Sequence, residues 1–204
     1  MAQSTLLIVA IGFALGALTP PGTAVGARAP LSERLIGDTL AEQVQGYLNT
    51  DIVIMSLRAA NVERANATQR DIDALDRRWR EEREADIQPL VASTLASPVS
   101  NYLTRIQADS GGLFTEIILV DANGLNVGQI AVTGDMWQGD EAKFQKTFAV
   151  GPGAVFVDAA EFHESSGTWR SQLNLTVDDP ATGEPLGAAT FEVNLTELHR
   201  RGAS

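Results

Sequence analysis

The sequence predicts an α+β fold, with helices in the first part of the chain and an antiparallel sheet in the second. Three observations predict it. Apolar residues recur every three or four positions from residue 32 to about residue 107. Five runs rich in apolar and β-branched residues, separated by turn sequences, follow between residues 114 and 195. The 204 residues are 44% hydrophobic and 20% charged, as expected of one globular domain.

The first 27 residues predict an export signal. An uncharged apolar run from Leu6 to Leu18 precedes two prolines and small residues that flank a candidate cleavage position after Ala27. The run is shorter than the about 20 apolar residues of a membrane span. We therefore expect a signal peptide over residues 1–27, with an uncleaved anchor as the alternative. Residues 28–204 are expected to form one periplasmic or secreted domain, with a helical part over 31–110 and a sheet part over 113–195.

The helical part is expected to begin with one long helix over residues 32–62. Its inner face consists of apolar residues three or four positions apart, and Gly37 and Gly46 are the two positions that weaken it. Such a helix would measure about 45 Å and could also mediate dimerisation. Shorter helices are expected over 68–84, where Thr68 is the N-cap, and over 88–95 and 98–107.

The sheet part is expected to contain five antiparallel strands, over residues 114–120, 125–132, 154–163, 169–177 and 186–195. Both faces of the first strand are mostly apolar, which is typical of a central strand covered on both sides. Asn123 and Gly124 favour a tight turn after it, and Asp121 is interpreted as a structural residue of that turn. Residues 179–183 predict a second turn.

The loop over residues 134–146 is the candidate ligand site. It combines carboxylates, large aromatic rings and Lys143 and Lys146, the only lysines of the chain. A small zwitterion or carboxylate needs donors, an acceptor and an apolar wall. The expected contact residues are Asp135, Trp137, Gln138, Asp140 and Lys143. The alternative is a short surface helix over 141–146, with Trp137 and Phe144 packed into the core and the charges merely solvated.

The order of these segments resembles the extracytoplasmic Cache (PDC-type, PAS-like) sensor domains. The chain has a strand, the turn D-A-N-G, a strand, the loop W-Q-G-D-E-A-K and three more strands. The resemblance covers residues 31–195 and is most specific over 116–146. It implies a PAS-like sheet, a small-molecule sensor and a signalling partner such as a membrane receptor. Gly134 and Met136 stand where related sensors have serine and tyrosine, so ligand contacts through those hydroxyls cannot be carried over.

Composition and motifs exclude several other functions. A formal charge of −11 argues against nucleic-acid binding, and the absence of cysteine excludes thiolate chemistry and cysteine-based zinc sites. No nucleophile elbow, P-loop or H-E-x-x-H motif occurs, so neither an enzyme nor a cofactor is expected. Alternation along a strand prevents Asp158, Glu161 and His163 from sharing one face as metal ligands. The expected function is binding of a small solute such as an amino acid or carboxylate; the alternative is a ligand-free dimerisation module.

Overall fold

The computed structural model describes residues 32–202. The predicted signal peptide and its cleavage site lie outside these residues. Within the described part, no helix is long and apolar enough to cross a membrane.

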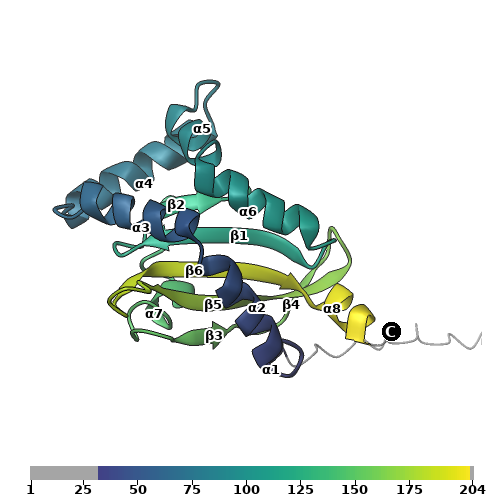
Figure 1. The fold of residues 1–204 in the computed structure, drawn as a ribbon. Coiled ribbons are helices and arrows are strands. Elements are labelled where there is room, and N and C mark those ends of the chain that lie inside the picture. The colour runs from purple at the N-terminus through teal and green to yellow at the C-terminus, as the bar shows by residue number, and fades with distance from the viewer. Residues whose placement is uncertain (1–31, 203–204) are drawn as a thin grey trace, which may run out of the picture.

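A single antiparallel sheet forms the centre of the molecule (Figure 1). Five strands follow each other in the order β2-β1-β6-β5-β3, and the short β4 pairs with β5 beyond β3. The α+β class and the five-stranded antiparallel arrangement are therefore confirmed. The strands are β1 (Phe114–Asp121), β2 (Asn126–Gln129), β3 (Val155–Val157), β4 (Glu161–His163), β5 (Thr168–Asp178) and β6 (Pro185–Asn194).

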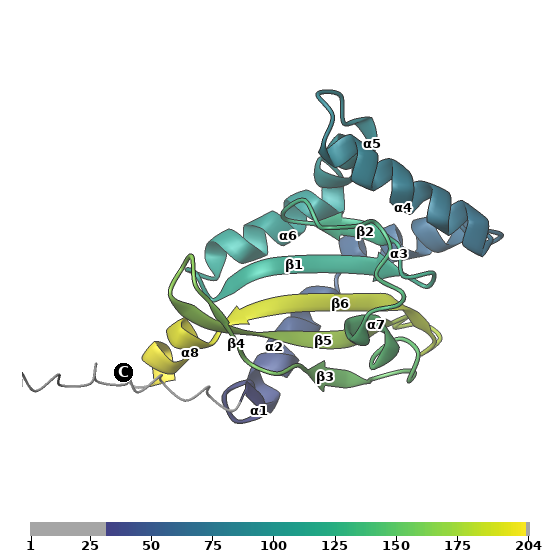
Figure 2. The same ribbon diagram turned by 180° about the vertical axis from the view of Figure 1, so that it is seen from behind.

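Helices cover one face of this sheet, and the opposite face is more open. Figures 1 and 2 show α2 (Asp38–Leu48) crossing the covered face and the one-turn α7 (Ala142–Gln145) on the other. Apolar residues of α2, α3 (Asp51–Glu63) and α6 (Pro98–Asp109) pack on alternate residues of β1, β5 and β6 to form the main core. The remaining helices are α1 (Ser32–Leu35), α4 (Gln69–Arg83), α5 (Pro89–Leu95) and α8 (Leu195–Gly202).

The prediction of one continuous helix over residues 32–62 is wrong, because the segment is broken twice. Gly37 and Thr50 both have extended backbones and act as the N-caps of α2 and α3, so the chain forms three successive helices. Gly46 lies inside α2 without breaking it. The apolar stripe continues across both breaks because Leu48 and Val53 face the same core. Periodicity therefore predicted the buried face correctly but not the kinks.

Two strand boundaries also differ from the expectation. The second strand is limited to four residues, and the run over 154–163 is divided into β3 and β4 around Asp158. The tail after residue 195, where no element was expected, forms α8. Its Glu197 carboxylate pairs with Arg200 and Arg201 at 2.7 and 2.9 Å, which favours this short helix.

The third helix is attached to both hairpin turns at one end of the sheet. Arg58 binds Asp179 through two hydrogen bonds of 2.8 and 2.6 Å. Six residues later, at the C-cap of α3, Arg64 donates to the Asp121 carboxylate at 2.7 Å. Asp121 is fully buried and also accepts backbone N–H groups of its own turn, which confirms its structural role.

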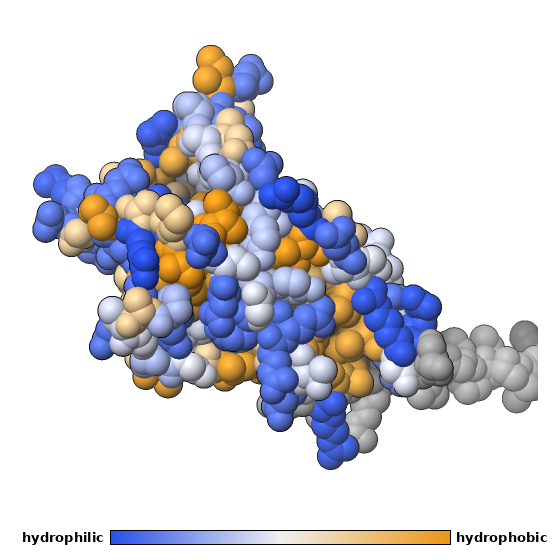
Figure 3. Space-filling model, in the orientation of Figure 1, coloured by the Kyte–Doolittle hydropathy of each residue, from blue (hydrophilic) through white to orange (hydrophobic). Residues whose placement is uncertain are grey.

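The outer side of α3 exposes an apolar stripe. Met55 and Val62 are 65% and 79% exposed, and Ala59 lies between them. These positions are four and three residues apart, so they lie on one helix face. Figure 3 shows apolar surface in this region of the molecule.

Candidate functional site

Polar side chains form a row across the sheet face opposite the main core. The antiparallel register places Glu116 of β1 opposite Glu192 of β6, and Gln172 of β5 opposite Glu192 on its other side. Side chains alternate along a strand, so these three residues point away from the helices. Their chain neighbours belong to the main core: Ile117, Leu173, Phe191 and Val193.

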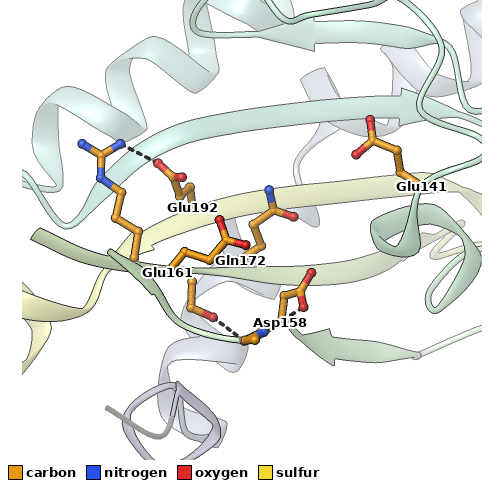
Figure 4. A pocket seen from close by; sticks show the side chains of 8 residues that line it. Glu141, Asp158, Glu161, Gln172 and Glu192 are labelled. Carbon is orange, nitrogen blue, oxygen red and sulfur yellow. Dashed lines mark hydrogen bonds and ion pairs between the residues drawn. The ribbon is translucent and has the colours of Figure 1, made fainter. Parts of the chain in front are cut away.

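A cleft of about 180 Å³ opens beside this row. Its charged and polar walls are Glu141, Asp158, Glu161, Arg170, Gln172 and Glu192, which come from α7, the segment between β3 and β4, and strands β4, β5 and β6 (Figure 4). Two larger hollows are both more open to solvent. One, of about 400 Å³, lies between α3, α5 and β2, and the other, of about 480 Å³, lies beside α1 and α8. The cleft is therefore the candidate site, because it is the more enclosed space and charged groups converge on it.

Arg170 is held firmly at the wall of the cleft. Its Nη1 atom donates to the Glu192 carboxylate at 2.9 Å, Nη2 to Ser166 Oγ at 3.1 Å and Nε to Thr168 Oγ1 at 3.3 Å. Thr115 Oγ1 donates to the same Glu192 carboxylate. Glu192 is thus fixed by a guanidinium and a hydroxyl group.

Glu116 lies in an unfavourable environment for a carboxylate. Burial raises the pKa of its carboxyl above the ordinary value of 4.5, and the neighbouring Glu192 and Glu141 raise it further, whereas Lys143 and Arg170 lower it. Within the described part of the chain, no group donates a hydrogen bond to this side chain. The fold therefore retains a half-buried acid that its own donors do not satisfy.

Three of the five predicted contact residues form one hydrogen-bonded network. The Lys143 Nζ atom donates to Gln138 Oε1 at 2.8 Å, and the Gln138 amide donates to Asp135 Oδ1 at 2.5 Å. Lys143 also pairs with Glu141 at 3.1 Å, and its side chain is only 11% exposed. The network therefore ends at Glu141 on the cleft wall. Asp140 is exposed to solvent beside it.

Trp137 closes the turn between β1 and β2. Its Nε1 atom donates to the Asn123 carbonyl at 3.0 Å, and its ring lies against Gly139, where a Cβ atom would be 2.3 Å from Nε1. Gly124 has a φ of +77°, and a Cβ atom there would be 2.6 Å from the Cα atom of Gly139. Glycine is required at both positions, because a side chain would displace the ring or the backbone.

The short helix and the buried Phe144 of the alternative expected for this loop are confirmed, but its charges are not merely solvated, because Lys143 is bound to Gln138 and Glu141. A one-turn helix, α7, spans residues 142–145, and Phe144 is buried beside Ile118 and Val120 of the sheet. The Phe144 ring stacks on Phe148 at 4.9 Å. This apolar contact holds α7, and with it Glu141 and Lys143, against the open face of the sheet. Direct ligand contact by the five predicted residues stays a prediction.

The fourth helix anchors the beginning of the loop. Asp76 Oδ1 accepts hydrogen bonds from the backbone N–H groups of Met136 and Trp137 at 3.0 and 3.2 Å. The fully buried Trp79 donates to the Thr133 carbonyl at 3.1 Å. The loop thus lies between α4 on one side and the cleft on the other.

The sequence analysis did not select Glu116, Arg170, Gln172 or Glu192 as site residues. A signal for the two glutamates was present, because each stands alone among apolar residues in a strand of a covered sheet. Arg170 carries no comparable local signal, since its pairing with Glu192 depends on strand register. In residues 32–202, no three His, Cys, Asp or Glu side chains are grouped as metal ligands would be.

Comparisons with known proteins give similarities at the level of structure only. No protein-family model and no curated protein matches the chain. Solved structures do match. They include the extracellular domain of a protein described as a histidine kinase, with 9% identity and a TM-score of 0.46 over 79% of this chain. A Campylobacter jejuni chemoreceptor ligand-binding domain in complex with 4-methylisoleucine has 11% identity and a TM-score of 0.39 over 82% of this chain.

A third match is the ligand-binding domain of a Pseudomonas aeruginosa amino-acid chemoreceptor in complex with GABA, with 16% identity and a TM-score of 0.36 over 81% of this chain. The chain spans 51%, 65% and 61% of the lengths of these three structures. The solved structures to which it is similar are thus extracellular and ligand-binding domains of sensory proteins, the class that its sequence resembles.

Proposed function

We propose that this protein is a non-enzymatic sensor domain, periplasmic or secreted, that binds a small organic solute such as an amino acid or a carboxylate in the cleft beside β5 and β6. The observation that carries the proposal is the convergence of Glu161, Arg170 and Glu192 on one cleft at the open face of the sheet, with the half-buried Glu116 next to Glu192. The sequence resemblance to sensor domains supports the same conclusion.

A purely structural role explains these charges poorly. Removing ionised groups from water is unfavourable unless each is paired, and Glu116 is half-buried, receives no hydrogen bond from residues 32–202 and lies next to Glu192. Residues with shifted pKa values in a cleft are candidates for function for this reason. A ligand that supplies the missing partner would remove the penalty when it binds.

The loop is proposed to form one edge of the site. Lys143 holds Glu141 at the cleft wall, and Gln138 and Asp135 hold Lys143 in turn. Direct ligand contact by Asp135, Trp137, Gln138, Asp140 or Lys143 remains part of the proposal. A Lys143→Met variant separates the two roles: direct contact predicts loss of affinity for carboxylates in particular, and support of the wall predicts a similar loss for all ligands.

We propose that the domain passes its signal to a membrane receptor, because the sequence resemblance is to domains that are usually joined to a signalling module. Co-purification from crosslinked membranes, with and without solute, tests this expectation.

The ligand test is a thermal-shift screen of amino acids, amines and short carboxylates, followed by calorimetry. A ligand at a hundredfold excess over its dissociation constant should stabilise the fold by about 2.7 kcal/mol. Glu192→Gln should weaken binding about tenfold, because hydrogen bonds to charged groups contribute about 1.5–3 kcal/mol. Glu84→Gln, an exposed change of the same charge at the end of α4, is the matched control. The proposal fails if no solute binds, or if both variants behave alike.

A second function, dimerisation through the first helices, is favoured by the apolar stripe of Met55, Ala59 and Val62. Apolar side chains this exposed on one helix face are suited to a partner surface. Sedimentation should then show a dimer that the double change Met55→Ser, Val62→Ser converts to monomer. A wild-type monomer at high concentration would contradict this function and leave the ligand proposal intact.

A further inference from the structure

We infer that the ligand of this cleft is an organic cation, a small molecule that presents one or two ammonium groups and needs no carboxylate. The inference rests on the proposed function and narrows the ligand classes named there. It follows from which polar groups of the cleft are already bound within the protein and which remain available.

The positive charge of Arg170 is already paired within the protein. Three of the five guanidinium N–H groups donate to protein oxygens: Glu192, Ser166 and Thr168. The Glu192 carboxylate balances the charge of the guanidinium at 2.9 Å. A ligand carboxylate would therefore have to share Arg170 with Glu192, next to a charge of its own sign, or displace one of these partners.

The second cation near the cleft is occupied as well. Lys143 donates to Gln138 and pairs with Glu141, and with 11% of its side chain exposed it is largely closed to solvent. Lys146 lies over the Phe156 ring, 4.0 Å from its centroid, and does not line the cleft. Among the residues that the structure describes, the cleft thus offers a carboxylate ligand no readily available cation.

Acceptors, in contrast, remain available. Glu116 receives no hydrogen bond from any described residue, and Glu161 projects from β4 into the same space with its side chain exposed. Among the described residues, Lys143 pairs with Glu141 and Arg170 with Glu192, whereas Glu161 on the cleft wall and Glu116 beside Glu192 have no such cation. An ammonium group supplies three donors and a positive charge, which is what these acceptors lack.

The dimensions limit the ligand to a short chain. A water molecule takes up about 30 Å³ in the liquid, so a cleft of about 180 Å³ has the volume of roughly six waters. A linear diamine of five carbons is of this order of size. One end could bind Glu161 on the cleft wall, and the other could extend along the polar row toward Glu116 beside Glu192.

The environment of Glu116 links binding to pH. Glu192 on β6, Glu141 and Lys143 at α7 and Arg170 on β5 are the charged groups that act on it. A bound cation lowers the raised pKa of this carboxyl, so the ligand binds the ionised form and releases a proton where Glu116 is still protonated. Cation affinity is therefore expected to rise as the pH rises through the titration of Glu116.

Three probes of matched length and different charge test the inference on the purified full chain. They are 1,5-diaminopentane, 5-aminopentanoate and glutarate, measured by calorimetry at constant ionic strength, with calcium chloride as the inorganic control. We expect affinity in the order diamine, amino acid, dicarboxylate. Glu116→Gln and Glu161→Gln should each weaken the diamine about tenfold, and Glu84→Gln by less than about twofold.

The possible failures can be told apart. Tighter binding of 5-aminopentanoate or glutarate, abolished by the cleft variants, overturns the inference and leaves the proposed function standing. Diamine binding that all three variants leave unchanged shows nonspecific attraction to an acidic protein and also overturns it. Preference for calcium would identify a metal site instead. If neither these probes nor any solute of the wider screen binds, the proposed function fails together with the inference.

Discussion

Replacing Asp76 should release the loop that borders the cleft. In Asp76→Ala, the backbone N–H groups of Met136 and Trp137 lose their acceptor. Met136 is fully buried, so its donor would have no access to water, whereas Trp137 is partly exposed. Leaving a buried donor unsatisfied costs about 1–3 kcal/mol, which gives a total loss of about 3 kcal/mol in the free energy of unfolding.

Two matched variants separate this hydrogen-bonding effect from a general effect on α4. Asp76→Asn retains an acceptor oxygen and loses the ion pair with the mostly exposed Arg80, so it should cost at most about 1 kcal/mol. Asp73→Ala removes an exposed aspartate from the same helix. The only described contact of the Asp73 side chain is with Gln69, so this change should alter the free energy of unfolding by less than about 0.5 kcal/mol.

The assay is urea unfolding followed by tryptophan fluorescence. Trp79 is a suitable reporter, because its indole lies buried against the loop and donates to Thr133. A loss of about 3 kcal/mol would also lower the melting temperature by roughly 6–12 °C for a domain of this size. Equal unfolding free energies for Asp76→Ala and Asp73→Ala would refute the conclusion that α4 anchors the loop.

Two further outcomes are expected. Gly139→Ala should destabilise the fold by about 1–3 kcal/mol, because the added Cβ would lie 2.3 Å from Trp137 Nε1, whereas Gly134→Ala meets no atom within 4 Å and should be nearly neutral in the same urea assay. Because the folded state holds the Glu116 proton more tightly than the unfolded state, wild-type stability should fall as the pH rises from about 4.5 through the raised pKa of Glu116. Glu116→Gln removes this dependence, so its stability relative to wild type should increase over that pH range; a constant difference would show that Glu116 does not titrate as described.

Much of the fold could be predicted because its signals are local. Thr68 begins α4 with both hydrogen bonds of a capping box, and Pro98 stands in the first turn of α6, as the sequence indicates. The Asn123–Gly124 turn and the strands on either side of the second turn also occur where expected. In each case a few neighbouring residues determine the conformation, so no knowledge of the tertiary structure is needed.

The helix breaks show where local patterns stop being informative. Apolar spacing reports which side of a segment is buried, and this side stays the same from Leu40 to Leu57. The turn around Asn49 and Thr50 changes the direction of the chain without changing that side. Periodicity alone therefore could not locate the kink.

By itself, the sequence determined that helices precede an antiparallel sheet, that a polar loop lies between the second and third strands, and that the chain is acidic and lacks cysteine. Only the tertiary structure decided which charges meet. Glu116, Arg170 and Glu192 come from three strands and converge through strand register, whereas Lys143 and Gln138 of the candidate loop are bound to each other. The physical reason is that a charged cleft depends on pairings between residues distant in the chain, and one-dimensional spacing carries no record of those pairings.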